Sequence, residues 1–537
     1  VRSPLWGLFA AVGLLLLLAC ANVANLFLGR TGGRHAELSV RLALGAERSR
    51  LVRLVSLEGL VLAVVGGALG VVTAWAGTRL LVDVLQIPPA LATRLSTATP
   101  VIAFALLMTT LSALIGGTLP ALLSLKESTL ADIRVGTRSL VGGARHRLRN
   151  FLVVAEVALA LALLVGAGLQ VRSLQQSLNV TTGYQPASVL TMELGLSGPR
   201  YTEDGVARSY LQQFLEQAGG VAGVQSVAIV SQLPLGGNFD GWGIHREDKP
   251  SANPENDPSA QRFAVSWQYL DVMSIPVIRG RGFTAADRAG AEPVVMFNEA
   301  AVMEIFDGED PIGKRVRVGG GEGPWRRVIG VVRDVRHLSL ERAIESQFYM
   351  PYDQTLYEET DYVVVARING EPATLGDPLT RAAKALDRGA VIARVRPMLD
   401  VVNTATQSRR LASTLIGAFA VIALLLASGG LYGVMSAGVT ERRREMGLRS
   451  ALGASPTSIV RLVVSRGLAL TVAGSVIGGM GVVAAQGLLR QFVFGVTPGD
   501  PITLLSVAAL LAAVAMVACV VPAWRAAHID PAITLRE

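Results

Sequence analysis

The clearest chemical pattern in this sequence is a group of arginine and glutamate side chains before a Leu-Gly pair, and it occurs twice. The first copy consists of Arg34, Glu37, Arg41, Leu44 and Gly45, and the second of Arg442, Glu445, Arg449, Leu452 and Gly453, with identical spacing. A charged flank that only sets membrane topology would not need the same residues at the same spacing in both copies. The pattern therefore predicts a docking segment for another protein.

The similarity between the two copies continues into the apolar segment after each motif. Gly66 and Gly70 in the first copy correspond to Gly474 and Gly478 in the second. Glycines four residues apart allow helices to approach closely inside a membrane. The shared spacing predicts an internal repeat, with these four glycines as helix-packing positions.

The elements that must position these motifs are membrane-spanning helices. Hydrophobic residues make up 51% of the 537 residues, which is too apolar for a chain of soluble domains. A hydrocarbon core of ~30 Å needs ~20 apolar helical residues. Seven segments meet this requirement: residues 5–27, 54–82, 101–123, 151–169, 411–434, 462–488 and 502–521.

The basic residues indicate how the spans are oriented. The formal net charge is +8, and the arginines are concentrated in short segments beside the apolar spans. By the positive-inside rule these segments and the C-terminal end lie in the cytoplasm, and the long segment between the fourth and fifth spans lies outside. The charge thus favours a lipid bilayer over nucleic acid as the partner. An odd number of spans places Val1 outside, so we expect a further span before residue 1.

Polar residues inside the spans are few. Asn22 and Asn25 are expected to make hydrogen bonds between helices, with substrate contact as the less favoured alternative. Glu58, near the inner border of its span, is the main candidate for an ionisable residue there, so no polar pathway through the membrane is predicted. Cys20 and Cys519 lie in spans and predict neither a disulfide nor a metal site.

Residues 170–410 have the composition of a soluble mixed α/β domain. We predict strands at residues 188–194, 224–231, 262–266, 293–297, 315–318, 327–332 and 362–368, and helices at 203–217, 299–306 and 375–386. This order predicts two small α/β lobes, one of them built from discontinuous segments. Residues 308–315 have the spacing of a phosphate-binding loop but end in Arg315 where Ser or Thr would hold magnesium, so we predict a turn that opens a strand.

These motifs resemble the permeases of ABC transporters of the MacB type, whose membrane part is called the FtsX-like domain. The family signature Arg-x-x-Glu-x3-Arg-x-Ala-Leu-Gly-Ala is matched at residues 34–46 and 442–454. Residues 269–284, 294–300, 310–314 and 328–335 look like the MacB-type periplasmic core domain, and the ending at 522–531 matches as well. The doubled unit looks most like the duplicated permeases described from acidobacteria. Unlike MacB itself, the sequence contains no ATPase domain.

The resemblance implies an α-helical integral membrane protein with about seven transmembrane helices, arranged as two FtsX-like three-helix units, and one external mixed α/β core domain. The implied domains are a first FtsX-like unit (residues 1–125), a basic cytoplasmic linker (126–150), a transmembrane helix (151–172), a periplasmic core domain (173–408) and a second FtsX-like unit (409–537). The implied location is the bacterial inner membrane, with the core domain in the periplasm.

The resemblance also implies mechanotransmission. A separate cytoplasmic ATPase, which would bind ATP and magnesium, docks on the two motif copies and moves the helices, while this chain binds no cofactor. A periplasmic adaptor or an outer-membrane component is a further implied partner.

Three functions remain open from the sequence. The favoured one is a permease that exports or extracts an unidentified substrate, such as a drug, peptide, lipoprotein or lipid. The alternative is a non-transporting FtsX-like scaffold or signalling protein that regulates an external partner. A membrane-anchored hydrolase is least supported because no catalytic set of side chains is visible, and we therefore do not expect an enzyme.

Overall fold

The computed structural model of the chain divides into two compact units. One comprises residues Val1–Leu174 with Leu411–Glu537, and the other Gln175–Arg410. The structure describes residues 2–33, 47–84, 103–104, 107–110, 138–178, 180–202, 205–251, 257–319, 323–355, 359–452, 454–490, 495–497 and 499–528. We call the first unit the helical unit and the second the external unit, and describe each by itself.

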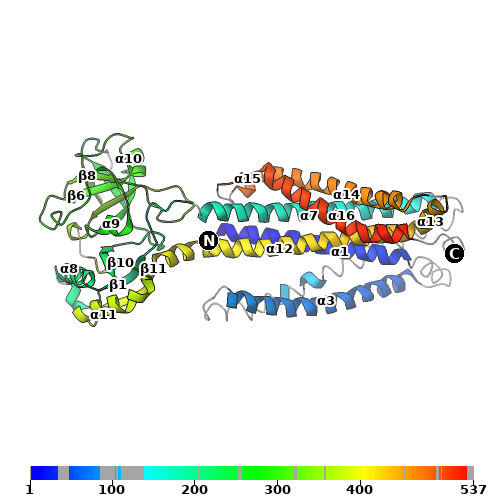
Figure 1. The fold of residues 1–537 in the computed structure, drawn as a ribbon, viewed down its shortest axis with the longest axis horizontal. Coiled ribbons are helices and arrows are strands. Elements are labelled where there is room, and N and C mark those ends of the chain that lie inside the picture. Colours follow the sequence, from blue (N-terminus) through cyan, green and yellow to red (C-terminus); the bar gives the residue numbers. More distant parts are fainter. Residues whose placement is uncertain are drawn as a thin grey trace. The chain divides into compact units, whose positions relative to one another are not determined.

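The helical unit consists of long apolar helices (Figure 1). Its described helices are α1 (Arg2–Gly33), α3 (Arg48–Val84), α7 (Arg138–Leu178), α12 (Met398–Glu441), α13 (Arg443–Ala451), α14 (Pro456–Ala484), α15 (Gln486–Leu489) and α16 (Pro501–Ala527). The first residues of α12 and the last of α7 belong to the external unit. Inside a bilayer the helix satisfies every backbone polar group by itself, which is why apolar runs of this length adopt it.

Five of the described helices are long and apolar enough to cross a membrane. They are Trp6–Leu26, Arg147–Leu178, Arg409–Glu441, Pro456–Ala484 and Pro501–Ala527. They match five of the seven predicted spans. The span predicted at residues 54–82 lies within α3, a continuous helix that is not among the five. The span predicted at residues 101–123 lies mostly outside the described residues, and residues 138–150 of the predicted linker are the helical start of α7.

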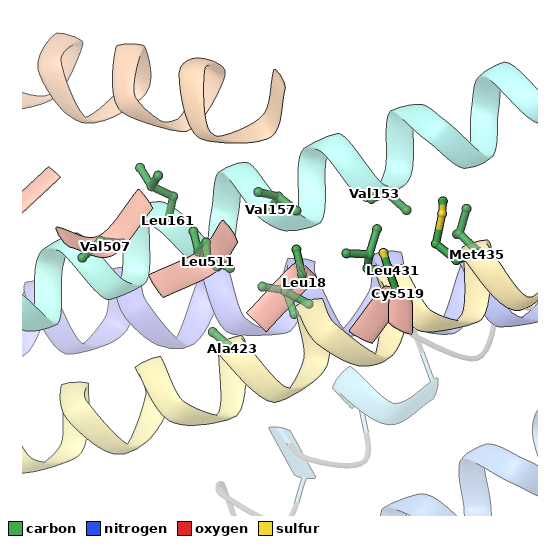
Figure 2. Close-up of a cluster of buried hydrophobic side chains, with 14 of the residues drawn as sticks. Leu18, Val153, Val157, Leu161, Ala423, Leu431, Met435, Val507, Leu511 and Cys519 are labelled. Carbon is green, nitrogen blue, oxygen red and sulfur yellow. The ribbon is translucent and has the colours of Figure 1, made fainter. Parts of the chain in front are cut away.

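One apolar core joins α1, α7, α12, α14 and α16. Figure 2 shows part of it, where Leu18, Val157, Leu431 and Leu511 from four of these helices lie close together. Close approach of helices requires small residues at the crossing points.

Two of the predicted packing glycines lie at such a crossing. A Cβ added at Gly474 would lie 2.6 Å from the Cβ of Val157, and one at Gly478 would lie 2.7 Å from the carbonyl oxygen of Ala158. Both neighbours belong to α7. Around Gly66 and Gly70 of α3, the described part of the chain places no heavy atom within 4 Å of such a Cβ.

The external unit is built on a sheet of 11 strands with two lobes. The strands are β1 (Val189–Gly195), β2 (Val224–Val230), β3 (Gly241–Arg246), β4 (Ser259–Val265), β5 (Val277–Gly280), β6 (Val294–Asn298), β7 (Arg315–Val318), β8 (Arg326–Val332), β9 (Gln347–Pro351), β10 (Asp361–Ile368) and β11 (Val391–Pro397). Its helices are α8 (Val206–Gly219), α9 (Tyr269–Met273), α10 (Glu299–Ile305) and α11 (Gly376–Leu386), with 3-10 turns at Pro199–Thr202, Tyr352–Gln354 and Pro372–Leu375.

The first lobe is a layer of strands in the order β11-β1-β10-β2 covered by α8 and α11 (Figure 1). Alternate residues of β10 enter different cores: Tyr362 and Val364 pack against the two helices, whereas Val363 and Val365 pack into the core that this lobe shares with the second lobe. A strand buried on both faces is apolar throughout, which explains its continuous hydrophobic run. The lobe combines residues from before 231 and after 360, so it is discontinuous in sequence.

The second lobe is a small closed barrel. β3 pairs with β4 and β7, β7 with β8, β8 with β6, β6 with β9, and β9 with β4, which completes a circuit of six strands. One apolar core receives side chains from all six strands and from α10. Closure leaves none of these six strands as a free edge.

Candidate docking site on the helical unit

The second copy of the charged motif forms a short helix between two long ones. α12 ends at Glu441, Arg442 interrupts the helix with φ −104 and ψ 18, and α13 follows. α14 then begins at Pro456 after the extended N-cap residue Ser455. Proline suits the first helical position because its fixed φ is helical and its missing N–H would have no partner there. The sequence thus builds a separate nine-residue segment at the motif.

α13 has a buried and an exposed side. Met446 is only 5% exposed and belongs to the same core as Ala523 and Ala526 of α16, which α13 contacts. Leu448 is 51% exposed and Leu452 is 79% exposed. Met446 therefore anchors the segment, while the two leucines leave apolar surface exposed.

The charged residues of the motif lie on the same exposed segment. The Arg449 guanidinium donates to the Glu445 carboxylate at 2.7 Å, and both side chains are nearly half exposed. A pair at i, i+4 stabilises a surface helix by about 0.3–0.5 kcal/mol. Arg442 is exposed beside it. The structure therefore brings together Arg442, Glu445, Arg449 and Leu452, and Gly453 lies outside the described residues.

The first copy of the motif also lies outside the described residues. Arg34, Glu37, Arg41, Leu44 and Gly45 fall in the gap between residues 33 and 47. The roles predicted for them stay predictions.

A partly buried ion pair connects the end of α12, next to α13, to α7. Arg149 is 2% exposed, and its guanidinium donates to both carboxylate oxygens of Glu441, with Nη1 at 3.1 Å from Oε1 and Nη2 at 3.5 Å from Oε2. A Cβ added at Gly438 of α12 would lie 3.5 Å from the same guanidinium. A buried arginine is stable only with such a partner. The end of α12, one residue before Arg442, is thus fixed to α7.

A second polar link joins α7 to α16 at the start of α16. Asp500 caps that helix by accepting from the Thr503 backbone N–H at 3.0 Å, and Arg172 of α7 pairs with the same carboxylate. The Thr503 hydroxyl, which donates at 2.6 Å, and the Arg172 charge hold the pKa of Asp500 below its usual range. α7 is therefore tied by charged groups to α12 and to α16.

The segment with the spacing of a phosphate-binding loop has its lysine already paired. The Lys314 ammonium lies 2.5 Å from Glu309 and 3.0 Å from Asp248, and these two carboxylates raise the pKa of Lys314. The next residue, Arg315, begins β7, in agreement with the predicted turn before a strand. Among the described residues, no three His, Cys, Asp or Glu side chains lie together as a metal site would require.

Sequence reasoning missed several residues of this region. Arg149 was counted as part of a basic linker, and its partner Glu441 lies 292 residues away. In so short a helix, the sequence alone does not show that Met446 is buried and Leu448 exposed. The expectation that Glu58 is the main ionisable residue in a span was wrong, because Glu156 lies fully buried in α7. Glu156 stands inside an apolar run, where a single carboxylate was a sufficient signal.

The apolar helices, the exposed charged segment and the separate α/β unit are the features of a multi-pass membrane protein with a folded domain outside its helices. The model of the FtsX-like permease C-terminal family matches residues 9–129 and 417–531, and the model of the MacB-like periplasmic core domain matches residues 151–407. The chain belongs to the MacB-like ABC transporter permeases, which combine these two kinds of domain.

Relatives of similar sequence are named as ATP-binding/permease proteins. The chain is 26% identical over 290 residues to the macrolide export ATP-binding/permease protein MacB of Marinobacter nauticus, an alignment that covers 51% of this chain and 43% of that protein. It is 29% identical over 228 residues to the protein of the same name from Aggregatibacter actinomycetemcomitans, covering 41% and 34%. The chain thus spans less than half the length of these relatives.

The periplasmic region of MacB from Actinobacillus actinomycetemcomitans is a similar solved structure. It shares 20% identity with this chain, and the match covers 43% of this chain and 97% of that structure with a TM-score of 0.30.

Proposed function

We propose that this chain is the permease part of an ABC transporter that works by mechanotransmission, and that a separate ATPase subunit docks on α13. The observation that carries the proposal is the two-sided build of α13. Met446 anchors it to the helix bundle, while Leu448 and Leu452 are exposed beside Glu445 and Arg449. Exposed apolar side chains surrounded by paired charges form the usual composition of a protein interface.

The contacts of α13 and its neighbouring residues support a route by which movement of a docked ATPase would reach the helix bundle. A displacement of α13 acts on α16 through Met446 and on α7 through the pair of Glu441 with Arg149. Packed helices respond to such a shift as rigid elements. The segment at residues 34–46, in the first FtsX-like unit of residues 1–125, is the second docking position in this proposal.

The proposal assigns ATP and magnesium to the partner ATPase, and no cofactor to this chain. The curated relatives are named as macrolide export proteins. We therefore propose export or extraction of a substrate handled by the external unit in the periplasm, at the inner membrane, with a periplasmic adaptor or outer-membrane component as a further partner. The rival function is a scaffold that regulates an external protein without substrate transfer.

The experiment is co-purification of the full-length protein with its ATPase from native membranes, followed by the ATPase rate. Leu448→Asp and Leu452→Asp are expected to remove the ATPase from the complex while the protein remains in the membrane. Met303→Asp is the matched control, because Met303 of α10 is 70% exposed, a value between those of the two leucines, but lies in the external unit. Retention of a stimulated ATPase by both leucine variants would refute docking on α13. Absence of any ATPase from the wild-type preparation would favour the scaffold.

A further inference from the structure

A group of polar side chains lies inside the apolar helix bundle, away from the docking segment. Asn22 and Asn25 come from α1 and Glu156 from α7, and all three are buried, Glu156 with none of its surface exposed. We call these three residues the polar cluster. The residues that flank Glu156 in the core, Val153 and Val157, are buried as well (Figure 2). The carboxyl group therefore has no access to water in this packing.

α12 leaves space for the carboxyl group. A Cβ added at Gly430 would lie 2.9 Å from the Glu156 Cδ and 3.2 Å from its Oε1. A side chain at position 430 would therefore clash with the carboxyl group, whereas glycine does not. On the same helix, the Leu426 carbonyl accepts a hydrogen bond from Asn22 Nδ2 at 2.9 Å. The three helices α1, α7 and α12 thus meet at the polar cluster.

The unpaired atoms of the cluster indicate what it binds. Asn25 lies beside the Glu156 carboxyl group and is near enough to interact with it. Even so, both oxygens of Glu156 and both polar atoms of the Asn25 side chain are buried without a hydrogen bond of normal geometry. A carboxylate with no cation or donor is far too costly to bury in an apolar medium. One added proton removes the difficulty, because a carboxylic acid and a carboxamide are complementary. The acid O–H would donate to Asn25 Oδ1, and Asn25 Nδ2 would donate to the other carboxyl oxygen.

The charged side chains described on the surrounding helices lie toward the helix ends. They are Arg147, Arg149 and Arg172 on α7, Asp400, Arg409, Arg410 and Glu441 on α12, Arg461 and Arg466 on α14, and Arg525 on α16. Arg149 is seven residues from Glu156, about 10 Å of helix rise, and is paired with Glu441. The other titratable side chains described on these helices are Cys20, Tyr432 and Cys519, which ionise at higher pH than a carboxyl group in water.

We propose that the polar cluster is a proton-binding site, in which Glu156 holds one proton while α1, α7 and α12 are packed together. Separation of these helices admits water, and the proton then leaves for the solvent, since a carboxylate is stable there. This site does not rest on the ATPase docking proposed above. It makes the stability of the packed bundle dependent on pH.

The test is infrared spectroscopy of the full-length protein in lipid nanodiscs. The wild type is expected to show the C=O stretch of a protonated carboxylic acid at neutral pH, with a downshift in D2O, and Glu156→Gln is expected to lack it. Glu216→Gln removes an exposed carboxylate of the external unit and serves as the matched control, which keeps the band. Absence of the band from the wild type would overturn the proposal. An increase in thermal stability with sodium concentration in the wild type alone would also overturn it, because the site would then hold a cation on an ionised carboxylate.

A second measurement does not depend on any single variant folding well. As the pH rises above the ordinary carboxyl pKa of ~4.3, the wild type is expected to lose thermal stability relative to Glu156→Gln, which is isosteric and cannot ionise. The difference between the two proteins stops growing at the pH where the acid band of the folded wild type disappears, because both states have then lost the proton. Cys20 and Tyr432 are present in both proteins, so the difference between the two profiles reports on Glu156. Identical profiles would refute the proton site.

Discussion

The buried and exposed sides of α13 lead to opposite expectations for two apolar residues only two positions apart. Met446 is 5% exposed within the helix-bundle core, and Leu448 is 51% exposed. Met446→Ala removes the anchor of the segment. Leu448→Ala removes exposed apolar surface to which the proposed ATPase would bind.

The stability loss expected for Met446→Ala follows from the burial of this side chain. Truncation of a buried methionine to alanine costs about 2–5 kcal/mol in protein cores. Because α13 is a nine-residue helix, one side of which is exposed, we take the low end, about 2 kcal/mol. This value corresponds to a roughly 30-fold increase in the population in which α13 is detached from the bundle. Leu448→Ala leaves that population within about twofold of the wild type.

The assay is amide hydrogen exchange of residues 443–451 in the full-length protein, measured in nanodiscs without the ATPase. Exchange through local opening reports the detached population directly. Met446→Ala is expected to accelerate exchange of these amides by about 30-fold. Leu448→Ala is expected to exchange like the wild type but to bind the ATPase more weakly.

Equal acceleration in both variants would show that Leu448 is also an anchor and would refute the two-sided assignment. Unchanged exchange in Met446→Ala would show that α13 is held by its covalent neighbours alone. In that case the route from α13 to α16 would have to be abandoned, whatever the ATPase measurements show.

Three further predictions concern the links between helices and the external unit. Arg149→Gln is expected to lower the free energy of unfolding by about 1–2 kcal/mol, less than for a fully buried pair because Glu441 is half exposed. Adding Glu441→Gln should cost less than the sum of the two single changes, and strict additivity in thermal melts would show that the pair is not coupled. Gly478→Ala is expected to cost about 1–3 kcal/mol because its Cβ would clash with the backbone of α7. Gly479→Ala has open space among the described residues and is the control, so equal losses of stability in the two variants would contradict the crossing at Gly478. Asp287 accepts two hydrogen bonds from the Arg281 guanidinium, at 2.7 and 2.8 Å. Arg281 holds the pKa of Asp287 below its usual range. Because the folded-state pKa is lower than the unfolded one, the stabilisation is present above pH ~4 and is lost as the pH falls through the folded pKa. Asp287→Asn should therefore remove part of the acid sensitivity of the external unit in hydrogen exchange, and an unchanged acid profile would count against this pairing.

The sequence predicted the elements whose signal is local. Runs of apolar residues located five helices that the structure shows to be long and apolar enough to cross a bilayer, because such a run is visible without any partner. The strand at β10 was predicted because its residues are apolar on both faces. The motif at residues 442–453 was visible because the chain repeats it.

The elements that were missed depend on distant partners. β9 (Gln347–Pro351) contains a glutamine and ends in a proline, and it is a strand because it pairs with β4 and β6 inside the closed barrel. β11 is largely exposed and has little apolar alternation to reveal it. β5 has only four residues, all exposed. In each case the backbone partner that fixes the strand lies far away in sequence, so local propensity could not identify it.

The polar cluster and the docking segment act on the same pair of helices. Glu156 and Arg149 are separated by two turns of α7, and Gly430 and Glu441 by three turns of α12. A pull on the end of α12 through α13 must therefore either break the pair of Arg149 with Glu441 or move α7 and α12 together. In the first case the polar cluster stays closed and keeps its proton. In the second, any change in the spacing between these helices and α1 opens the cluster to water, because the carboxyl group fits only against the bare backbone of Gly430. Infrared difference spectra of the complex with and without ATP distinguish these two cases, since only the second changes the band of Glu156.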